Sequence, residues 1–137
     1  MNKHTKLFIK FLFVALFFAA LAGCTPETDD DFSLPRDKFI GSWQCLDSDG
    51  AGYHATISAG SSDIEVVITN FFDLRGRVTA IITEGTITVN KQIMQGIQGT
   101  FHCEGFGRLT QKSGTHIIYW EKYIANDDDI TSTFTKQ

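Results

Sequence analysis

The sequence predicts an all-β fold, a small antiparallel barrel of about eight strands that follows an N-terminal signal and an acidic linker. From Phe39 onward, apolar and polar residues alternate with a period of two, which is typical of half-buried strands. Short runs rich in Gly, Asp, Asn and Ser separate these segments and favour turns. A barrel or a sandwich would accommodate so many short strands, and a barrel is favoured because closure leaves no exposed strand edge.

Residues 1–23 are expected to form an export signal. Lys3, Lys6 and Lys10 precede an uninterrupted apolar run, Phe11–Ala20. An apolar stretch of about 7–15 residues after a basic start is typical of a secretory signal. A helix that spans the membrane would need about 20 consecutive apolar residues. The segment therefore predicts secretion of the chain that follows it.

The apolar run ends in Leu21-Ala22-Gly23-Cys24, which resembles the lipobox of bacterial lipoproteins. The resemblance implies cleavage before Cys24, attachment of a diacylglycerol to its thiol, and acylation, for example with palmitate, of the new amine. Several acyl chains give durable membrane anchoring, whereas a single chain gives marginal binding. The alternative, a buried cysteine at the end of a core helix, fits the position and the charge pattern less well.

Residues 24–37 are expected to be the lipidated cysteine and an acidic tether. The segment contains Pro26, Pro35 and the acidic run Asp29–Asp31, and it has too little apolar surface to fold. Acidic residues just after the lipidated cysteine resemble the surface-export signal of some Gram-negative lipoproteins. This resemblance implies a lipid-anchored, surface-exposed protein of the outer membrane, with a periplasm-facing location as the alternative.

The charge balance excludes one class of partner. Removal of the three signal lysines lowers the formal net charge from −4 to about −7. Nucleic-acid binding relies on Lys and Arg contacts to phosphates, so we expect no nucleic-acid partner. Anionic lipid surfaces are unfavourable for the same reason, apart from the contact through the lipid anchor.

The expected strands follow one another with short connections. Strict alternation marks the first three, and the eighth is apolar on both faces, with Tyr119 and Tyr123 on one face and Trp120 on the other. A turn of helix is expected only at residues 91–97. In chain order the expected strands are 39–45, 53–58, 64–69, 77–83, 85–90, 98–103, 106–110, 116–124 and 130–135.

The segment Phe39-Ile40-Gly41-Ser42-Trp43 resembles the Gly-x-Trp opening of lipocalin-like (calycin) barrels. Residues 68–72, 87–89 and 96–100 resemble small envelope lipoproteins of the calycin-like group described as lipid-binding putative hydrolases. The resemblance implies a calycin-like barrel over residues 38–137, with Trp43 closing its floor. Where lipocalins usually carry an arginine at the end of the last strand, this chain has Lys136.

Two functions remain open at this point. A barrel of about eight strands either fills with side chains or holds one small ligand. The first hypothesis is a binding module for a small apolar, lipid-like ligand; the second is a non-enzymatic accessory protein with a filled barrel that binds a surface glycan or a protein partner. The residues expected to line a ligand site are Trp43, Tyr53, Phe101, Tyr119, Trp120 and Phe134.

The sequence offers no catalytic motif and no metal or cofactor site. Cys45 and Cys103 are both expected to point inward, where they form either a disulfide or two separate buried thiols. His54, His102 and His116 fall on three different expected strands, without the local spacing of a zinc site. The segment 47–50, Asp-Ser-Asp-Gly, is expected to be a tight turn.

Overall fold

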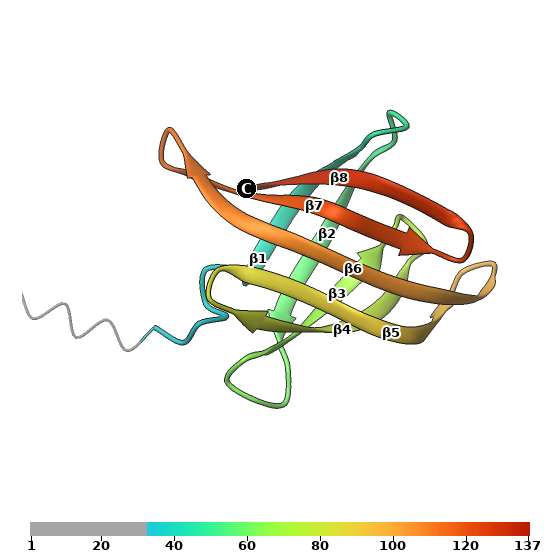
Figure 1. Ribbon diagram of the computed structural model, residues 1–137, viewed down its shortest axis with the longest axis horizontal. Coiled ribbons are helices and arrows are strands. Elements are labelled where there is room, and N and C mark those ends of the chain that lie inside the picture. Colours follow the sequence, from blue (N-terminus) through green and yellow to red (C-terminus); the bar gives the residue numbers. More distant parts are fainter. Residues whose placement is uncertain (1–32) are drawn as a thin grey trace, which may run out of the picture. The chain divides into compact units, whose positions relative to one another are not determined.

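The computed structural model describes Ser33–Gln137, which form a closed barrel of eight antiparallel strands (Figure 1). Each strand pairs with the next along the chain, and the last strand pairs with the first. The predicted all-β barrel is thereby confirmed. No helix of this described part is long and apolar enough to cross a membrane. The strands are β1 Gly41–Asp47, β2 Gly52–Ala59, β3 Glu65–Phe71, β4 Gly76–Thr83, β5 Thr86–Gly96, β6 Gly99–Lys112, β7 Thr115–Ala125 and β8 Asp128–Lys136.

Two sequence predictions about strands are wrong. The expected strands 98–103 and 106–110 form one strand, β6, of 14 residues, because Gly105 continues the ladder instead of ending it. The expected helical turn at 91–97 belongs to β5. A bulge between Val89 and Gln92 interrupts the strict alternation of β5, so that Val89 and Met94, five positions apart, both point inward.

The even number of antiparallel strands gives the barrel two distinct ends. The connections β2–β3, β4–β5 and β6–β7 lie at the end where the chain enters and leaves, on the left of Figure 1. We call this the N-terminal end. The connections β1–β2, β3–β4, β5–β6 and β7–β8 lie at the opposite, distal end, on the right of the same view.

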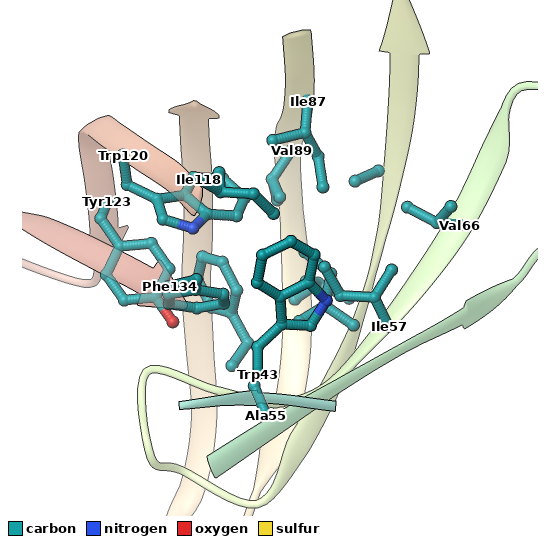
Figure 2. Close-up of a cluster of buried hydrophobic side chains, with 14 of the residues drawn as sticks. Trp43, Ala55, Ile57, Val66, Ile87, Val89, Ile118, Trp120, Tyr123 and Phe134 are labelled. Atoms are coloured by element: carbon teal, nitrogen blue, oxygen red, sulfur yellow. The ribbon is translucent and has the colours of Figure 1, made fainter. Parts of the chain in front are cut away.

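Aromatic side chains fill the interior of the barrel. Trp43, Trp120, Tyr123 and Phe134 are at most 1% exposed, and Figure 2 shows them converging from β1, β7 and β8. The ring centroids of Trp120 and Phe134 lie 5.5 Å apart, and those of Tyr123 and Phe134 lie 5.7 Å apart. Such contacts add to the stabilisation that comes from burying the apolar area itself.

Two glycines of β6 make room for the largest of these side chains. Gly105 and Gly107 both face inward, next to Trp120 on the neighbouring strand. A Cβ atom at Gly107 would lie 2.9 Å from Ile118 and 3.1 Å from both Ile87 and Trp120. Because these two residues have no side chain, they leave the space that the indole of Trp120 occupies.

The N-terminal end is closed by the segment that precedes β1. Ser33–Asp37, which the sequence analysis placed in the tether, form hydrogen-bonded turns against the barrel. The guanidinium of Arg36 donates to the carbonyl oxygens of Gly60, Ser62 and Glu65 around the β2–β3 connection. The barrel domain therefore includes residues that precede its first strand.

Trp43 and Lys136 meet at this closed end. The indole Nε1 of Trp43 donates to the carbonyl of Phe39 at 2.8 Å, and the ammonium of Lys136 lies 5.6 Å from the centroid of the Trp43 ring. Gly41 adopts a φ of +142°, and a Cβ there would lie 3.0 Å from Cε of Lys136. The glycine of the Gly-x-Trp segment therefore lets the lysine pass across to the tryptophan.

Candidate functional site

The residues expected to line a ligand site divide between the interior, the rim and the outside of the barrel. Trp43, Tyr53, Trp120 and Phe134 point inward and are 0%, 6%, 1% and 0% exposed. They contact one another or their neighbours in a continuous core cluster. Phe101 is half-buried at the distal end, and Tyr119 lies outside and is 45% exposed.

The pattern expected on β7 needs one correction. The sequence analysis placed Tyr123 on the face of Tyr119, opposite Trp120. The structure turns both Trp120 and Tyr123 inward, because the register between β7 and β8 shifts between these two residues. The bulge adds one residue, so that two positions three apart point to the same side.

A row of outward-facing side chains crosses four neighbouring strands. Leu46 on β1 and Tyr119 on β7 both pair with Thr133 on β8, and Arg108 on β6 pairs with Tyr119. Residues directly opposite each other on a sheet have Cβ atoms about 5 Å apart. We call Leu46, Thr133, Tyr119 and Arg108 the outer row. It brings together two of the large exposed hydrophobic residues, Leu46 at 58% and Tyr119 at 45% exposure.

Arg108 is held in place at one end of the outer row. Its Nε donates to Oε1 of Glu121 at 2.6 Å, and its guanidinium carbon lies 5.1 Å from the centroid of the Phe106 ring. Both charged side chains are more than half exposed, so this ion pair contributes little to stability. It orients a planar group of hydrogen-bond donors beside the exposed ring of Tyr119.

A second surface feature is a groove of about 460 Å³ on the outside of β5, β6 and β7. The side chains of Ile93 and Ile124 form part of its apolar lining, and those of Lys91 and His102 form part of its polar lining. A second groove, of about 540 Å³, lies at the N-terminal end between the segment 33–39 and the β4–β5 and β6–β7 connections.

A chain of hydrogen bonds lies buried at the distal end. Tyr53 and Ser132 donate their hydroxyl protons to Oδ1 of Asp47, at 3.1 and 2.5 Å. The hydroxyls of Tyr53 and Tyr123 lie 2.9 Å apart, and the backbone amide of Phe72 donates to the Tyr123 oxygen at 2.7 Å. Since the proton of Tyr53 goes to Asp47, Tyr123 must be the donor to Tyr53. In the series from the Phe72 amide through the two tyrosine hydroxyls to Asp47, each group therefore donates its proton to the next one.

Burial sets the acidity of these groups. It is the main cause that raises the pKa of Asp47 above its ordinary value, against the lowering effect of the hydrogen bonds from Ser132 and Tyr53. The negative charges of Asp49 and Asp73 raise that pKa further. Desolvation also raises the pKa values of Tyr53 and Tyr123, so both phenols stay protonated at neutral pH.

The sequence analysis missed this chain of hydrogen bonds because it assigned Asp47 to a tight turn. The turn is present, since the amide of Gly50 donates to the carbonyl of Asp47 at 2.9 Å. Asp47 is at the same time the last residue of β1 and continues the inward phase of Trp43 and Cys45. That alternation was the signal that could have identified it as a buried acid.

The β3–β4 connection lies over this chain of hydrogen bonds, and its backbone geometry is unusual. Asn70, at the end of β3, and Phe72, Asp73 and Arg75, in the connection itself, all have a positive φ, between 56° and 65°. This conformation is unfavourable for non-glycine residues, above all for a bulky one such as Phe72. The side chain of Asn70 stabilises it by donating to the carbonyl of His54 at 2.7 Å and accepting from the amide of Arg75 at 2.9 Å.

The two cysteines of residues 33–137, Cys45 and Cys103, are buried free thiols. Cys45 lies on β1 between Tyr53 and Phe134, and Cys103 lies on β6, where Ala125 is its partner on β7. Desolvation raises the pKa of Cys45 to about 12 and that of Cys103 to about 11. Because the thiolate is the reactive form, both side chains are poor nucleophiles at neutral pH.

The histidines stay apart from one another on β2, β6 and β7. His54 and His102 are exposed, and His116 is half-buried at the N-terminal end. Within Ser33–Gln137, no group of three or more His, Cys, Asp or Glu side chains is placed to hold a metal ion.

Comparison with known proteins leaves the chain without an assigned family. No family model, no curated protein and no solved structure matches it.

Proposed function

We propose that this protein is a lipoprotein anchored through Cys24 at the surface of the outer membrane, with a calycin-like barrel that binds a neutral surface glycan on its outer row. The signal, Cys24 and the acidic run Asp29–Asp31 lie outside the described residues, and the sequence alone supports the anchoring and the location. The barrel acts in this proposal as a non-enzymatic accessory module.

The packing of the interior is the observation that carries the proposal. Aromatic side chains from β1, β7 and β8 occupy the space that a ligand inside the barrel would need (Figure 2). Of the two hypotheses drawn from the sequence, the filled barrel that uses its outer surface is therefore the better supported. The resemblance to calycins gains support from Lys136, which lies over Trp43 as the lipocalin arginine would.

The chemistry of the outer row favours a sugar as the partner. Tyr119 offers an exposed ring to the apolar C–H face of a pyranose, and Thr133 and Arg108 beside it offer hydrogen bonds to hydroxyl groups. The net charge of the exported chain is about −7 after the loss of three lysines. Such a charge repels acidic polymers, so the proposed glycan is neutral.

The test is binding of the full chain, in an uncharged detergent, to an array of neutral glycans. We expect Tyr119→Ala to weaken binding about tenfold or more. Ile64→Ala removes a comparably exposed apolar side chain at the N-terminal end and should leave binding unchanged. Absence of binding to any neutral glycan, or equal binding by the Tyr119→Ala variant, would contradict the proposal.

The hypothesis of an interior lipid-like ligand is tested with the same preparation. Native mass spectrometry should show the mass of the lipidated chain alone, before and after incubation with fatty acids. A discrete additional mass that disappears on denaturation would instead favour a ligand inside the barrel, which would require the aromatic core to rearrange.

A further inference from the structure

Asp47 is a buried acid that no positive side chain of residues 33–137 contacts. It is 5% exposed, and its contacts are hydroxyl groups, from Ser132 and Tyr53. The ion pairs of the described residues join Arg108 to Glu121 and Lys122 to Glu104, and neither includes Asp47. Buried carboxylates are normally paired with a cation, because hydroxyl groups alone do not replace the lost hydration. Among the described residues, no positive side chain contacts the Asp47 carboxylate.

The groups that interact with Asp47 come from several strands and from two connections. Apart from Ser132 on β8, they are Cys45 on β1, Tyr53 on β2, Tyr123 on β7, Asp49 in the β1–β2 connection and Asp73 in the β3–β4 connection. All of these groups are neutral or negative. The distal end therefore has a local negative potential that a cation would relieve.

Aromatic rings lie at the same end of the barrel as the acid and connect to it through hydrogen bonds. The ring of Tyr123 is stacked by Phe72, with 5.0 Å between centroids and 18° between planes, and Phe71 lies 4.4 Å from it. The Tyr123 hydroxyl connects to Asp47 through that of Tyr53. Rings of this kind attract ammonium groups through the negative potential of their faces, most strongly when the site is shielded from water.

The ring that covers Tyr123 is held in an unfavourable conformation. Phe72 is only partly buried, and it has a φ of 57° in a connection where two other non-glycine residues also have a positive φ. Its amide is fixed by Tyr123 and its ring by stacking. Displacement of Phe72 would relieve the backbone and expose the face of Tyr123 next to the buried acid.

We propose that the distal end is a binding site for a small organic cation with a quaternary or tertiary ammonium group. The cation replaces the ring of Phe72 on the face of Tyr123 and supplies the positive charge that Asp47 lacks. This site is separate from the outer row and does not depend on the glycan-binding proposal.

The experiment is isothermal titration of the full chain, in an uncharged detergent, with choline and with 3,3-dimethyl-1-butanol, which replaces the nitrogen by carbon. We expect choline to bind at least tenfold more tightly than the neutral alcohol. Affinity for choline should fall as the pH is lowered and Asp47 becomes protonated. Equal binding of the two compounds, or no binding of choline, would overturn the proposal.

Variants locate the site. Asp47→Asn keeps an oxygen that accepts from Tyr53 and Ser132 but removes the charge, and it should weaken choline binding about tenfold. Asp63→Asn makes the same change of charge in the β2–β3 connection at the other end and should have no effect. Equal losses in the two variants would indicate a diffuse attraction and would contradict a site at Asp47.

A second pair of variants tests the displacement of Phe72. Phe72→Ala, or Phe72→Leu if the alanine variant does not fold, should tighten choline binding. An unchanged affinity in the folded variant would contradict the displacement of Phe72.

Discussion

The side-chain amide of Gln92 takes the place of a strand partner for Thr79. Its Oε1 accepts from the backbone amide of Thr79 at 2.9 Å, and its Nε2 donates to the Thr79 carbonyl at 2.8 Å. The two residues lie where β4 and β5 separate, beyond the last backbone pair, Ile81 with Thr88. The bulge in β5 turns Gln92 toward β4 and keeps this seam of the barrel closed.

Replacement of Gln92 should weaken the seam. Gln92→Ala removes both hydrogen bonds to Thr79, and we expect a loss of about 1–2 kcal/mol in the free energy of unfolding. Amide hydrogen exchange at Thr79 should become faster. Gln95→Ala serves as the control, since the Gln95 side chain accepts a single surface hydrogen bond, from Thr100. Unchanged exchange at Thr79 would show that backbone pairing, and not Gln92, closes the seam.

Addition of one methyl group at Gly107 should disturb the core. The new Cβ would lie 2.9–3.1 Å from three buried side chains, so Gly107→Ala is expected to destabilise the barrel by about 1–3 kcal/mol. Denaturant unfolding measures the change. At Gly52 the nearest atom to a new Cβ is 3.9 Å away, and Gly52→Ala should cost much less. Equal effects of the two substitutions would contradict the role of Gly107 in accommodating Trp120.

The charge of Lys136 should stabilise the closed end. Its ammonium lies over Trp43 and donates to the carbonyl of Lys38 at 2.9 Å, while burial lowers its pKa. Lys136→Met keeps the aliphatic stem and loses both interactions, which predicts a loss of about 1 kcal/mol in unfolding free energy. Lys136→Arg keeps the positive charge over the ring and should have nearly the same free energy of unfolding as the natural protein. A fully stable methionine variant would refute this role.

Asp47 should make stability depend on pH. Burial raises its pKa in the folded state above the ordinary 3.8, so the folded protein binds the proton more tightly than the unfolded chain does. Its contribution therefore favours folding at low pH and is lost as the pH rises through the raised pKa. In buffer without organic ammonium ions, Asp47→Asn should become more stable relative to the natural protein as the pH rises from about 3.8 toward neutral, as measured by denaturant unfolding. A difference that does not change with pH would contradict a raised pKa.

The lipid anchor is tested in cells. Cys24→Ser removes the thiol that the lipobox resemblance assigns to acylation, while the barrel is expected to fold as before. The variant should leave the membrane fraction for the soluble fraction, and its near-ultraviolet circular dichroism should match that of the detergent-extracted natural protein. Retention of the variant in the membrane would contradict anchoring through Cys24.

The fold could be predicted because inward-facing apolar residues and outward-facing polar residues alternate strictly in most strands. Trp43, Cys45 and Asp47 show this in β1, and Ile118 and Trp120 show it in β7. Prediction failed at the bulges in β5 and β7. A bulge is an extra residue in the pairing of two distant segments, and no local pattern at Tyr123 reveals on which side of it the residue lies.

The candidate surfaces were harder to predict for a related reason. The outer row joins Leu46, Thr133 and Tyr119 from strands that are far apart in the chain, and the register between the first and last strands decides that they meet. Residues 116–124 are apolar on both faces, so the sequence did not indicate that Tyr119 faces outward. The strain at Phe72 depends on contacts with Tyr123, 51 residues away, so it has no signature in the local sequence.

Closure of the barrel through β1 has a mechanical consequence. The chain enters the domain at the start of β1, and this strand is paired along its length with both β2 and β8. Tension between an anchor at the N-terminus and a bound partner would pull β1 along its own axis, and the hydrogen bonds on both of its edges would have to break together. A domain loaded in this shearing direction resists force better than one whose edge strand can be peeled away bond by bond.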